Sequence, residues 1–421
     1  MGRVLWATRS FAPGDLVMRE RPLLVFVDGD GGHDLIDKAL KMSEEDRLKL
    51  LDMYHLRPGD DPRFTIASYV KEQSEKKART VVSARASWSA YRFAYEVISM
   101  AAFNSHDFAT SSEQSLSGLF PLASLACHSC TANCTFTTAN PSGVICYYAA
   151  RSIAEGDPIS ILYDVRYAGM PTLQRWMVMA KGKDFVCQCS LCIGPDAMSG
   201  VKCLRCHEGV AMPTFPRLLP TTRELPTITD ATWLCDSCGH APEPYILAKQ
   251  LSEADKLTTQ VTNAAKHVRG DRPFSKSQAS NLRRIATHAH KKLGGVHSVI
   301  MGTTELSWAA IKANSRNRGM NDTVYTTSIV NLVEQLSIME CAEAGCSNGT
   351  VRCKIEHSPS HNFDIVADAL TCLMAITDLP KFVRLHGDEV AFLVRYLPLL
   401  ALTSQEHKYL AFRVPLKMLQ L

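Results

Sequence analysis

The sequence predicts an α+β protein that is closed by bound zinc, and three observations carry this prediction. Segments that alternate apolar and polar residues fill positions 3–27 and return at 143–163, which indicates short strands. From position 245 onward, apolar residues recur three or four apart, as in amphipathic helices. Between these regions, seven of the 15 cysteines lie from Cys187 to Cys238, mostly in closely spaced groups.

Size and composition are those of an ordinary globular protein. The 421 residues leave room for two to four domains, and the hydrophobic and charged shares are 46% and 21%. A net charge of +4 is too small to indicate nucleic-acid binding by itself. Apolar runs stay short of the ~18 residues that cross a membrane, and the N-terminus lacks the apolar region of a secretory signal. We therefore expect a soluble intracellular protein of the nucleus or cytoplasm that does not enter a membrane.

Strands and helices follow one another along the chain. Strands, read from alternation between turn residues, are predicted at 4–10, 16–20, 22–27, 143–149 and 159–163. Helices, read from apolar spacing, are predicted at 64–104, 171–183, 247–268, 280–293, 328–342, 365–377 and 389–400. Ser43 with Asp46 predicts a further helix start, and Thr403 with Glu406 forms a capping-box pattern. The proline-rich stretch 187–240 is expected to be mostly loop.

The C-terminal helices allow two arrangements. Repeated antiparallel helices of this length resemble a tetratricopeptide-like array, but a clean 34-residue period is missing. A plain helical bundle is the equal alternative.

The first group of cysteines has the spacing of zinc ligands. Cys187, Cys189 and Cys192 fall within six residues, and thiolates this close can surround one ion. A structural zinc needs four ligands, so the fourth must come from elsewhere in the chain.

The second group consists of two CxxC units, Cys203, Cys206, Cys235 and Cys238. Paired units of this kind indicate zinc, although the loop between them exceeds the usual ~15–20 residues. His207 and His240 flank the group and are weaker candidates for a ligand, and free thiols are the alternative to metal at both groups. Four thiolates close the coordination shell, so both sites are predicted to be structural and not catalytic.

Five segments, taken in order, resemble the SET domain of the SET-and-MYND (SMYD) family of protein-lysine methyltransferases. They are GRVLWATRSFAPGDLVMRERPLLV from residue 2, MAAFNSH from 100, LFPLASLACHSCTAN from 119, AARSIAEGDPISILYD from 149 and KDFVCQCSLC from 183. The ordered series is more specific than any one segment. The resemblance implies a SET β-fold core over residues 1–186 with a mostly helical insertion at 30–110. A zinc-bound post-SET segment and second knuckle would follow at 187–244, and a helical C-terminal domain at 245–421.

The resemblance also implies the site. Cys130 would supply the missing fourth ligand of the first zinc, and Tyr163 would be the catalytic residue. Phe103 and Phe185 would line the lysine channel together with Tyr163. The residues that would bind S-adenosylmethionine are Gly2, Arg3, Ala101, Cys127, His128, Tyr163 and Phe185. The chemistry agrees, because methyl transfer requires an unprotonated lysine held in line with a sulfonium, and an apolar channel lowers the pKa of that amine.

The chain departs from the family in two ways. Residues 28–126 contain no cysteine, so the zinc-binding MYND finger is absent there. In the cofactor pocket, Cys127 and Ala101 replace asparagines, and Val4 replaces a glycine. Losing one buried hydrogen bond costs about 1–3 kcal/mol, which predicts weaker cofactor binding.

Two functions therefore compete. The first is a protein-lysine methyltransferase acting on a histone tail or another protein through S-adenosylmethionine, with two structural zinc ions. The second is a catalytically weak or inactive scaffold that binds protein partners through its helical C-terminal domain. Nucleic-acid binding at the second knuckle, beside Lys202 and Arg205, is disfavoured because basic and aromatic residues are few there.

Overall fold

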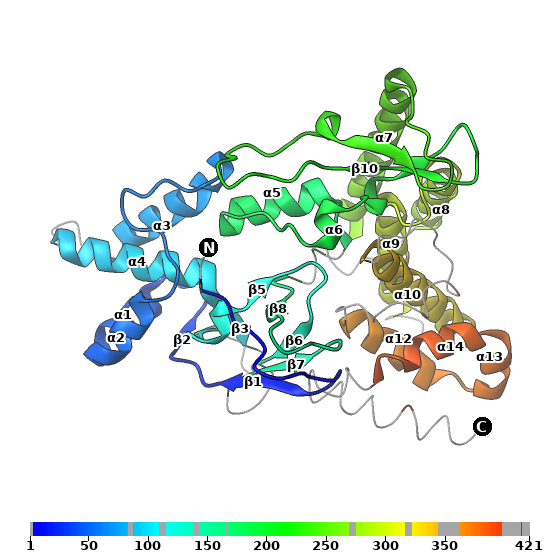
Figure 1. Ribbon diagram of the computed structural model, residues 1–421. Coiled ribbons are helices and arrows are strands. Elements are labelled where there is room, and N and C mark those ends of the chain that lie inside the picture. Colours follow the sequence, from blue (N-terminus) through cyan, green and yellow to red (C-terminus); the bar gives the residue numbers. More distant parts are fainter. Residues whose placement is uncertain are drawn as a thin grey trace.

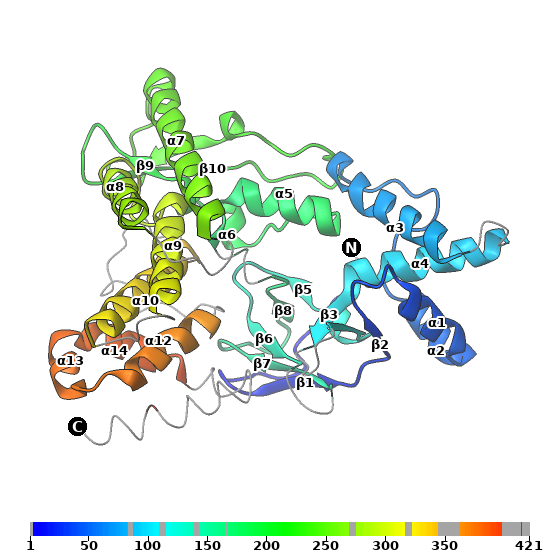
Figure 2. The same cartoon turned by 180° about the vertical axis from the view of Figure 1, so that it is seen from behind.

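The computed structural model describes residues 3–82, 87–108, 115–138, 143–164, 167, 169–268, 275–315, 322–343, 363–397 and 414. Small sheets lie at the centre, with the N-terminal helices on one side and the C-terminal helices on the other (Figure 1). The view from behind shows the same three-part arrangement (Figure 2).

Two antiparallel sheets come from the N-terminal part of the chain. The first has the order β1-β7-β6, with β1 at Leu16–Glu20, β7 at Ile145–Ala149 and β6 at Cys134–Thr137. The second has the order β2-β4-β3, with β2 at Leu24–Val27, β4 at Leu116–Leu119 and β3 at Ser105–Phe108. The strands predicted at 16–20, 22–27 and 143–149 are confirmed. The strand predicted at 4–10 is wrong, because that segment makes only isolated bridges, such as Trp6 with Pro158.

A short parallel pair lies beside these sheets. Strand β5 (Cys127–His128) pairs with β8 (Ser160–Ile161), so that Cys127 lies opposite Ser160. The backbone N–H of Cys127 donates to the Ile159 carbonyl at 3.2 Å. This pairing sets the segment around His128 next to the segment that leads to Tyr163.

Four α-helices are found in the described part of the helical insertion. They are α1 at His33–Lys41, α2 at Glu44–Leu51, α3 at Ser68–Val81 and α4 at Trp88–Asn104. The Ser43 side chain accepts from the Asp46 N–H at 3.1 Å, which confirms the predicted helix start. Helix α1 lies in the insertion that was expected to be mostly helical, but its start was not predicted, because it begins after Gly32 and has no side-chain cap.

The cysteine-rich stretch contains a small sheet between its loops. Helices α5 (Thr172–Lys183) and α6 (Ser190–Ile193) are followed by a sheet of order β11-β10-β9. Its strands are β9 at Val201–Lys202, β10 at Val210–Thr214 and β11 at Thr232–Cys235. Pro213 fits the central strand because β9 pairs only with Val210 and Ala211, so position 213 lies beyond the end of that ladder. Most of 187–240 is irregular, as expected, and this small sheet is the part that was not predicted.

The C-terminal region is helical, as predicted. Its helices are α7 at Pro244–Val268, α8 at Lys276–Lys292, α9 at Ser298–Ser315, α10 at Asp322–Glu343, α12 at Phe363–Ala375, α13 at Leu379–Leu385 and α14 at Gly387–Val394. Helices α9 and α13 were not predicted, and the Thr403–Glu406 pattern lies outside the described residues. The tetratricopeptide-like arrangement stays a prediction. Across the described part of the chain, every helix is too short or too polar to span a bilayer.

One hydrophobic core joins the β9–β11 sheet to the C-terminal helices. It combines Val201, Val210 and Trp233 with side chains of α7, α8 and α9, among them Leu257 and Ile285. The backbone N–H of Gly294 also donates to the Gly200 carbonyl at 2.9 Å. The second cysteine group is thus held on a sheet that rests against helices.

Candidate metal centres and aromatic site

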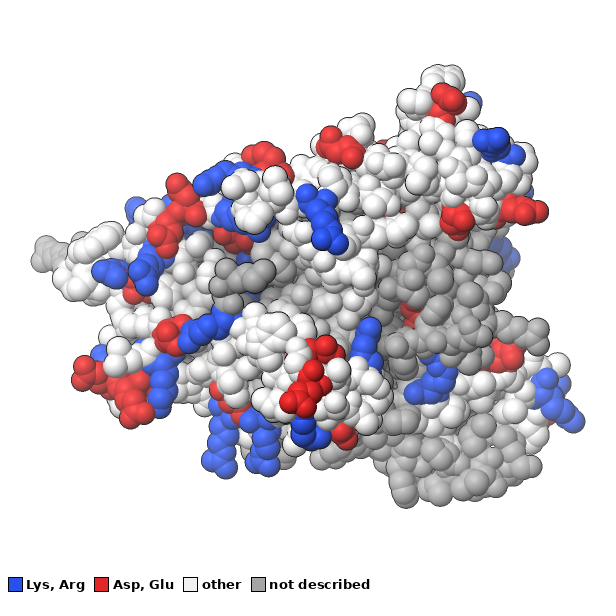
Figure 3. Space-filling view, viewed as in Figure 1, with Lys and Arg blue, Asp and Glu red and all other residues white. Residues whose placement is uncertain are grey.

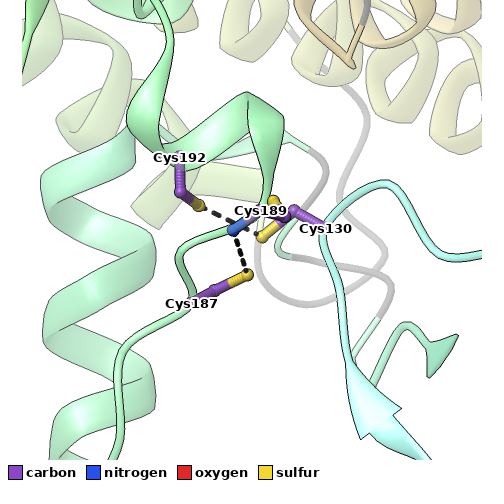
Figure 4. Close-up of side chains that lie close together, drawn as sticks. All are labelled: Cys130, Cys187, Cys189 and Cys192. Carbon is purple, nitrogen blue, oxygen red and sulfur yellow. Dashed lines mark hydrogen bonds between the residues drawn. The ribbon is translucent and has the colours of Figure 1, made fainter. Parts of the chain in front are cut away.

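The first predicted cysteine set comes together in the structure. Cys130, in the loop after β5, points toward Cys187, Cys189 and Cys192 at the start of α6 (Figure 4). All four sulfurs lie within 4.8 Å of one another. Three of these residues are buried and Cys189 is half-buried. The cluster therefore brings together two parts of the chain, Cys130 and Cys192, that are 62 residues apart in sequence.

The second set comes together as well. Cys203, Cys206, Cys235 and Cys238 also place their sulfurs within 4.8 Å of one another. The first pair follows β9, and the second pair begins at Cys235, the last residue of β11. Backbone N–H groups of Gly209 and Glu208 lower the pKa of Cys206 to about 7, which favours a thiolate.

The sulfur spacing in both sets matches a tetrahedral ion and not a disulfide. Zn–S bonds of ~2.3 Å in a tetrahedron place neighbouring sulfurs ~3.8 Å apart. The distances are 3.5 Å from Cys130 to Cys192, 3.9 Å from Cys203 to Cys238 and 3.7 Å from Cys206 to Cys235. A disulfide needs ~2.05 Å, and these cysteines are all free. Each set could therefore hold one metal ion.

Three aromatic rings surround His128, which contacts Cys130 of the first cysteine set. Tyr163, Tyr167 and Phe185 lie with ring centroids 5.1, 5.5 and 5.9 Å from the His128 ring. Tyr163 and Phe185 also face each other at 6.0 Å. The structure thus brings together three of the residues predicted for the reaction site.

Hydrogen bonds fix the orientation of the His128 ring. Its Nδ1 accepts from the Tyr163 backbone N–H at 3.2 Å, so its Nε2 carries the proton. That Nε2 lies 3.3 Å from the Cys130 sulfur and donates to it. Burial lowers the pKa of His128 to about 4, so the ring is neutral at physiological pH. His128 therefore links the Cys130 cluster to the backbone of Tyr163.

Tyr163 is held as a neutral phenol. Its hydroxyl donates to the Ala126 carbonyl at 2.9 Å. Burial raises the pKa of Tyr163 to about 12, because the phenolate would lose its water. The side chain can orient a substrate but does not ionise near neutral pH.

The remaining residues predicted to bind the cofactor have other partners. The Cys127 thiol donates to the Ile159 carbonyl at 3.4 Å, and Ala101 is buried in the core of the helical insertion. The Arg3 guanidinium donates to the Asp52 carboxylate at 2.5 Å and to the Asp52 carbonyl at 2.6 Å. Gly2 lies outside the described residues.

Phe103 is not in contact with the other rings of the predicted channel. Its ring packs edge-on against Tyr54, with centroids 5.0 Å apart, in a small cluster with Leu56 and Val70. The Lys183 ammonium donates to the Phe103 carbonyl at 2.9 Å. Phe103 therefore lies at the junction of α4 with the end of α5.

Arg175 is the residue near the first cysteine set that sequence reasoning missed. It lies on α5 with 0% of its surface exposed. Its Nη2 donates to the Cys192 sulfur at 3.7 Å and to the Thr172 hydroxyl at 2.7 Å, and its Nη1 donates to the Met170 carbonyl. A signal existed in the sequence, because Arg175 falls on the same helical face as Thr172, Trp176 and Met179, all of which are buried.

The surface charges of the molecule are mixed. On the face shown in Figure 3, acidic and basic side chains are interspersed over the described residues and form no continuous basic area. Beside the second cysteine set, Arg205 contacts His240 at 3.3 Å. This face therefore offers little support for nucleic-acid binding.

Comparison with known families agrees with this geometry. Residues 2–164 match the model of the family described as the SET domain. This part of the chain is therefore similar to SET domains, which form a family of protein-lysine methyltransferases that use S-adenosylmethionine. The match ends before the cysteines of 187–238. No curated protein matches the chain.

Proposed function

We propose that the chain is a protein-lysine N-methyltransferase that acts on a histone tail or another lysine-bearing protein. The observation that carries the proposal is the group of Tyr163, Phe185 and His128 at the end of the SET domain, tied through His128 to the Cys130 cluster. His128 and Tyr163 lie within the matched region, and Phe185 lies in the segment that follows it.

The side chains of this group suit an incoming lysine. The rings of Tyr163 and Phe185 form an apolar boundary that disfavours the ammonium form, and so lowers the pKa of a lysine placed there. Because Tyr163 keeps its proton, its role would be to orient the amine and not to deprotonate it. Rate enhancement would then come from alignment and from exclusion of water.

Two features of the site fit S-adenosylmethionine in part. Aromatic faces attract a cationic sulfonium, and His128 is fixed in one orientation by two hydrogen bonds. When bound, the cofactor would supply a methyl group on sulfur to the lysine nitrogen. The residues proposed to hold it are Gly2, Arg3, Ala101, Cys127, His128, Tyr163 and Phe185.

The metal centres would be structural. Four thiolates saturate a zinc ion, so each centre would hold segments of chain together. The first would fix Phe185, two residues before Cys187, against the His128 ring. This cysteine pattern also supports placing the chain with the SET-and-MYND proteins, without a MYND finger between residues 28 and 126.

A scaffold that binds protein partners is the second candidate function. It is favoured by the pocket residues, because the Cys127 thiol replaces an amide and its donor already binds the Ile159 carbonyl. Arg3 is likewise engaged by Asp52. In this case the helical C-terminal region would recruit the partner.

Calorimetric titration with S-adenosylmethionine separates the two functions. The enzyme hypothesis expects micromolar binding by the wild-type protein and transfer of labelled methyl groups to histone or peptide lysines. Cys127→Asn should tighten binding about 10- to 100-fold if the missing amide weakens the pocket. Binding by Cys127→Asn alone would favour the scaffold, and absence of binding by both proteins would reject the methyltransferase proposal.

Tyr163→Phe tests the reaction site, and Tyr147→Phe is its matched control. Both changes remove a hydroxyl that donates to a backbone carbonyl, at Ala126 and Ala123 respectively. Tyr163→Phe should lower kcat at least tenfold with little change in cofactor affinity, whereas Tyr147→Phe should leave kcat unchanged. Equal effects of the two variants would remove Tyr163 from the reaction site.

A further inference from the structure

Arg175 places a positive charge in the interior of the protein. Arg175 belongs to α5, and its side chain is fully buried. Its Nε has no hydrogen-bond partner among the described atoms. A buried cation is tolerated only where a nearby negative charge offsets the loss of water. The surroundings of Arg175 should therefore contain that negative charge.

The thiolates of the first cysteine set are the nearest source of it. The guanidinium donates to the Cys192 sulfur at 3.7 Å. Within the described part of the chain it makes no hydrogen bond to a carboxylate, although the buried Asp196 carboxylate is near enough to add a smaller favourable charge interaction. Its other donors go to neutral oxygens, the Thr172 hydroxyl and the Met170 carbonyl. Four thiolates around one Zn²⁺ leave an excess of negative charge, whereas four neutral thiols would leave the arginine with the smaller contribution of Asp196.

A second set of bonds holds the arginine in place. The Thr172 hydroxyl that accepts from Arg175 belongs to the first turn of α5, and the Thr172 N–H donates to the buried Asp196 carboxylate at 2.9 Å. That carboxylate also accepts from the Ser199 hydroxyl at 2.8 Å. These bonds connect the guanidinium to the start of α5, which precedes Cys187, and through Thr172 to Asp196, which follows Cys192.

We propose that Arg175 is a positioning residue of the first metal centre, where it offsets the charge of a zinc ion bound by four thiolates and fixes the Cys192 sulfur. This inference rests on the metal centre proposed above, but it does not depend on methyl transfer. Groups that hydrogen-bond metal ligands in this way change metal affinity by about 10- to 100-fold.

Two substitutions separate the charge of Arg175 from its volume. Arg175→Met keeps much of the volume without the charge, and Arg175→Lys keeps the charge with fewer donors. Zinc release to a chromophoric chelator measures retention at each centre. Cys238→Ala, which removes an exposed ligand of the second cluster, identifies which release phase belongs to which centre.

Arg205→Met is the matched control, because Arg205 lies beside the second cluster but contacts His240 and no sulfur. We expect Arg175→Met to release zinc from the first centre 10- to 100-fold more readily, with the second centre unchanged. Arg175→Lys should lie between it and the wild-type protein, and Arg205→Met should match wild type at both centres. The cobalt-substituted proteins should show the same order in the strength of their thiolate-to-cobalt absorption.

The outcomes separate this inference from the proposals before it. Equal zinc retention by Arg175→Met and wild type would overturn the inference, and so would equal losses in Arg175→Met and Arg175→Lys. If Arg175→Met does not fold, the Arg175→Lys protein decides the question. Zinc retention at its first centre close to that of wild type supports the role of charge, and loss of zinc from that centre overturns it. Wild-type protein without zinc at the first cluster would overturn the metal centre itself, whatever the outcome of the methylation assays.

Discussion

The most decisive prediction concerns Cys130→Ala, which removes the one ligand that comes from before the helical segment α5. Cys130 and Cys192 are 62 residues apart, and a shared ion would close the chain between them. By analogy with a disulfide, closing a loop of this length restricts the unfolded chain by about 4 kcal/mol. Without Cys130, the segment from α5 to α6 should open more easily by a similar free energy, equivalent to about a thousandfold in the opening equilibrium.

Hydrogen exchange measured on peptides from residues 172–193 is the direct assay. Cys134→Ala is the control, because Cys134 is also fully buried but lies in β6 outside the cluster. Burial raises the pKa of Cys134 to about 12, so it is a neutral thiol and its loss should cost only its packing. Chelator should accelerate exchange of 172–193 in the wild-type and Cys134→Ala proteins and change little in Cys130→Ala. Exchange in Cys130→Ala at the wild-type rate would refute the cross-link.

Three further predictions concern other parts of the fold. His297 is buried, and burial lowers its pKa to about 4. The unfolded chain therefore binds more protons than the folded protein between pH 6.5 and 4, and the free energy of unfolding should decrease by at most about 3 kcal/mol as the pH is lowered through that range. His297→Asn can still accept from the Val299 N–H, and denaturant titrations should show that its free energy of unfolding depends less on pH than that of the wild-type protein. A Cβ at Gly209 would lie 2.5 Å from the Cys235 sulfur, so Gly209→Ala should lose the zinc of the second cluster alone, and two zinc ions per chain in elemental analysis would contradict this. Gly182→Ala places a methyl group in open space within α5 and should raise the free energy of unfolding by about 0.5–1 kcal/mol; a lower melting temperature would show that the helix needs glycine there.

Local patterns predicted much of the fold. Ser43 caps α2 as its spacing to Asp46 indicated, and strand β7 follows the alternation of residues 143–149. These features depend on residues that are close in the sequence, so they could be predicted without knowing the partner segments. The sheet β9–β11 could not, since β9 has only two residues and the central strand contains Pro213.

In the candidate site, too, contacts within one segment could be predicted and contacts between distant segments could not. The three cysteines at 187–192 indicated a metal by spacing alone, but Cys130 was added from resemblance because nothing local connects it to them. Phe103 was assigned to the channel, whereas its ring packs on Tyr54, a contact between segments about fifty residues apart. Arg175 was passed over because a charged residue on a helix is usually exposed, and its partner Cys192 became apparent only in the folded chain.

The core shared by the β9–β11 sheet and helices α7–α9 determines how this protein can be divided for experiments. Trp233 and Met212 on the sheet belong to one buried core with Ala254 and Leu257 on α7, so a cut near residue 244 would expose apolar surface on both fragments. Each fragment expressed by itself should aggregate, and the two should remain soluble when produced together. A fragment that isolates the methyltransferase-like region should therefore end before Ala197, where this shared core begins, or extend through α9.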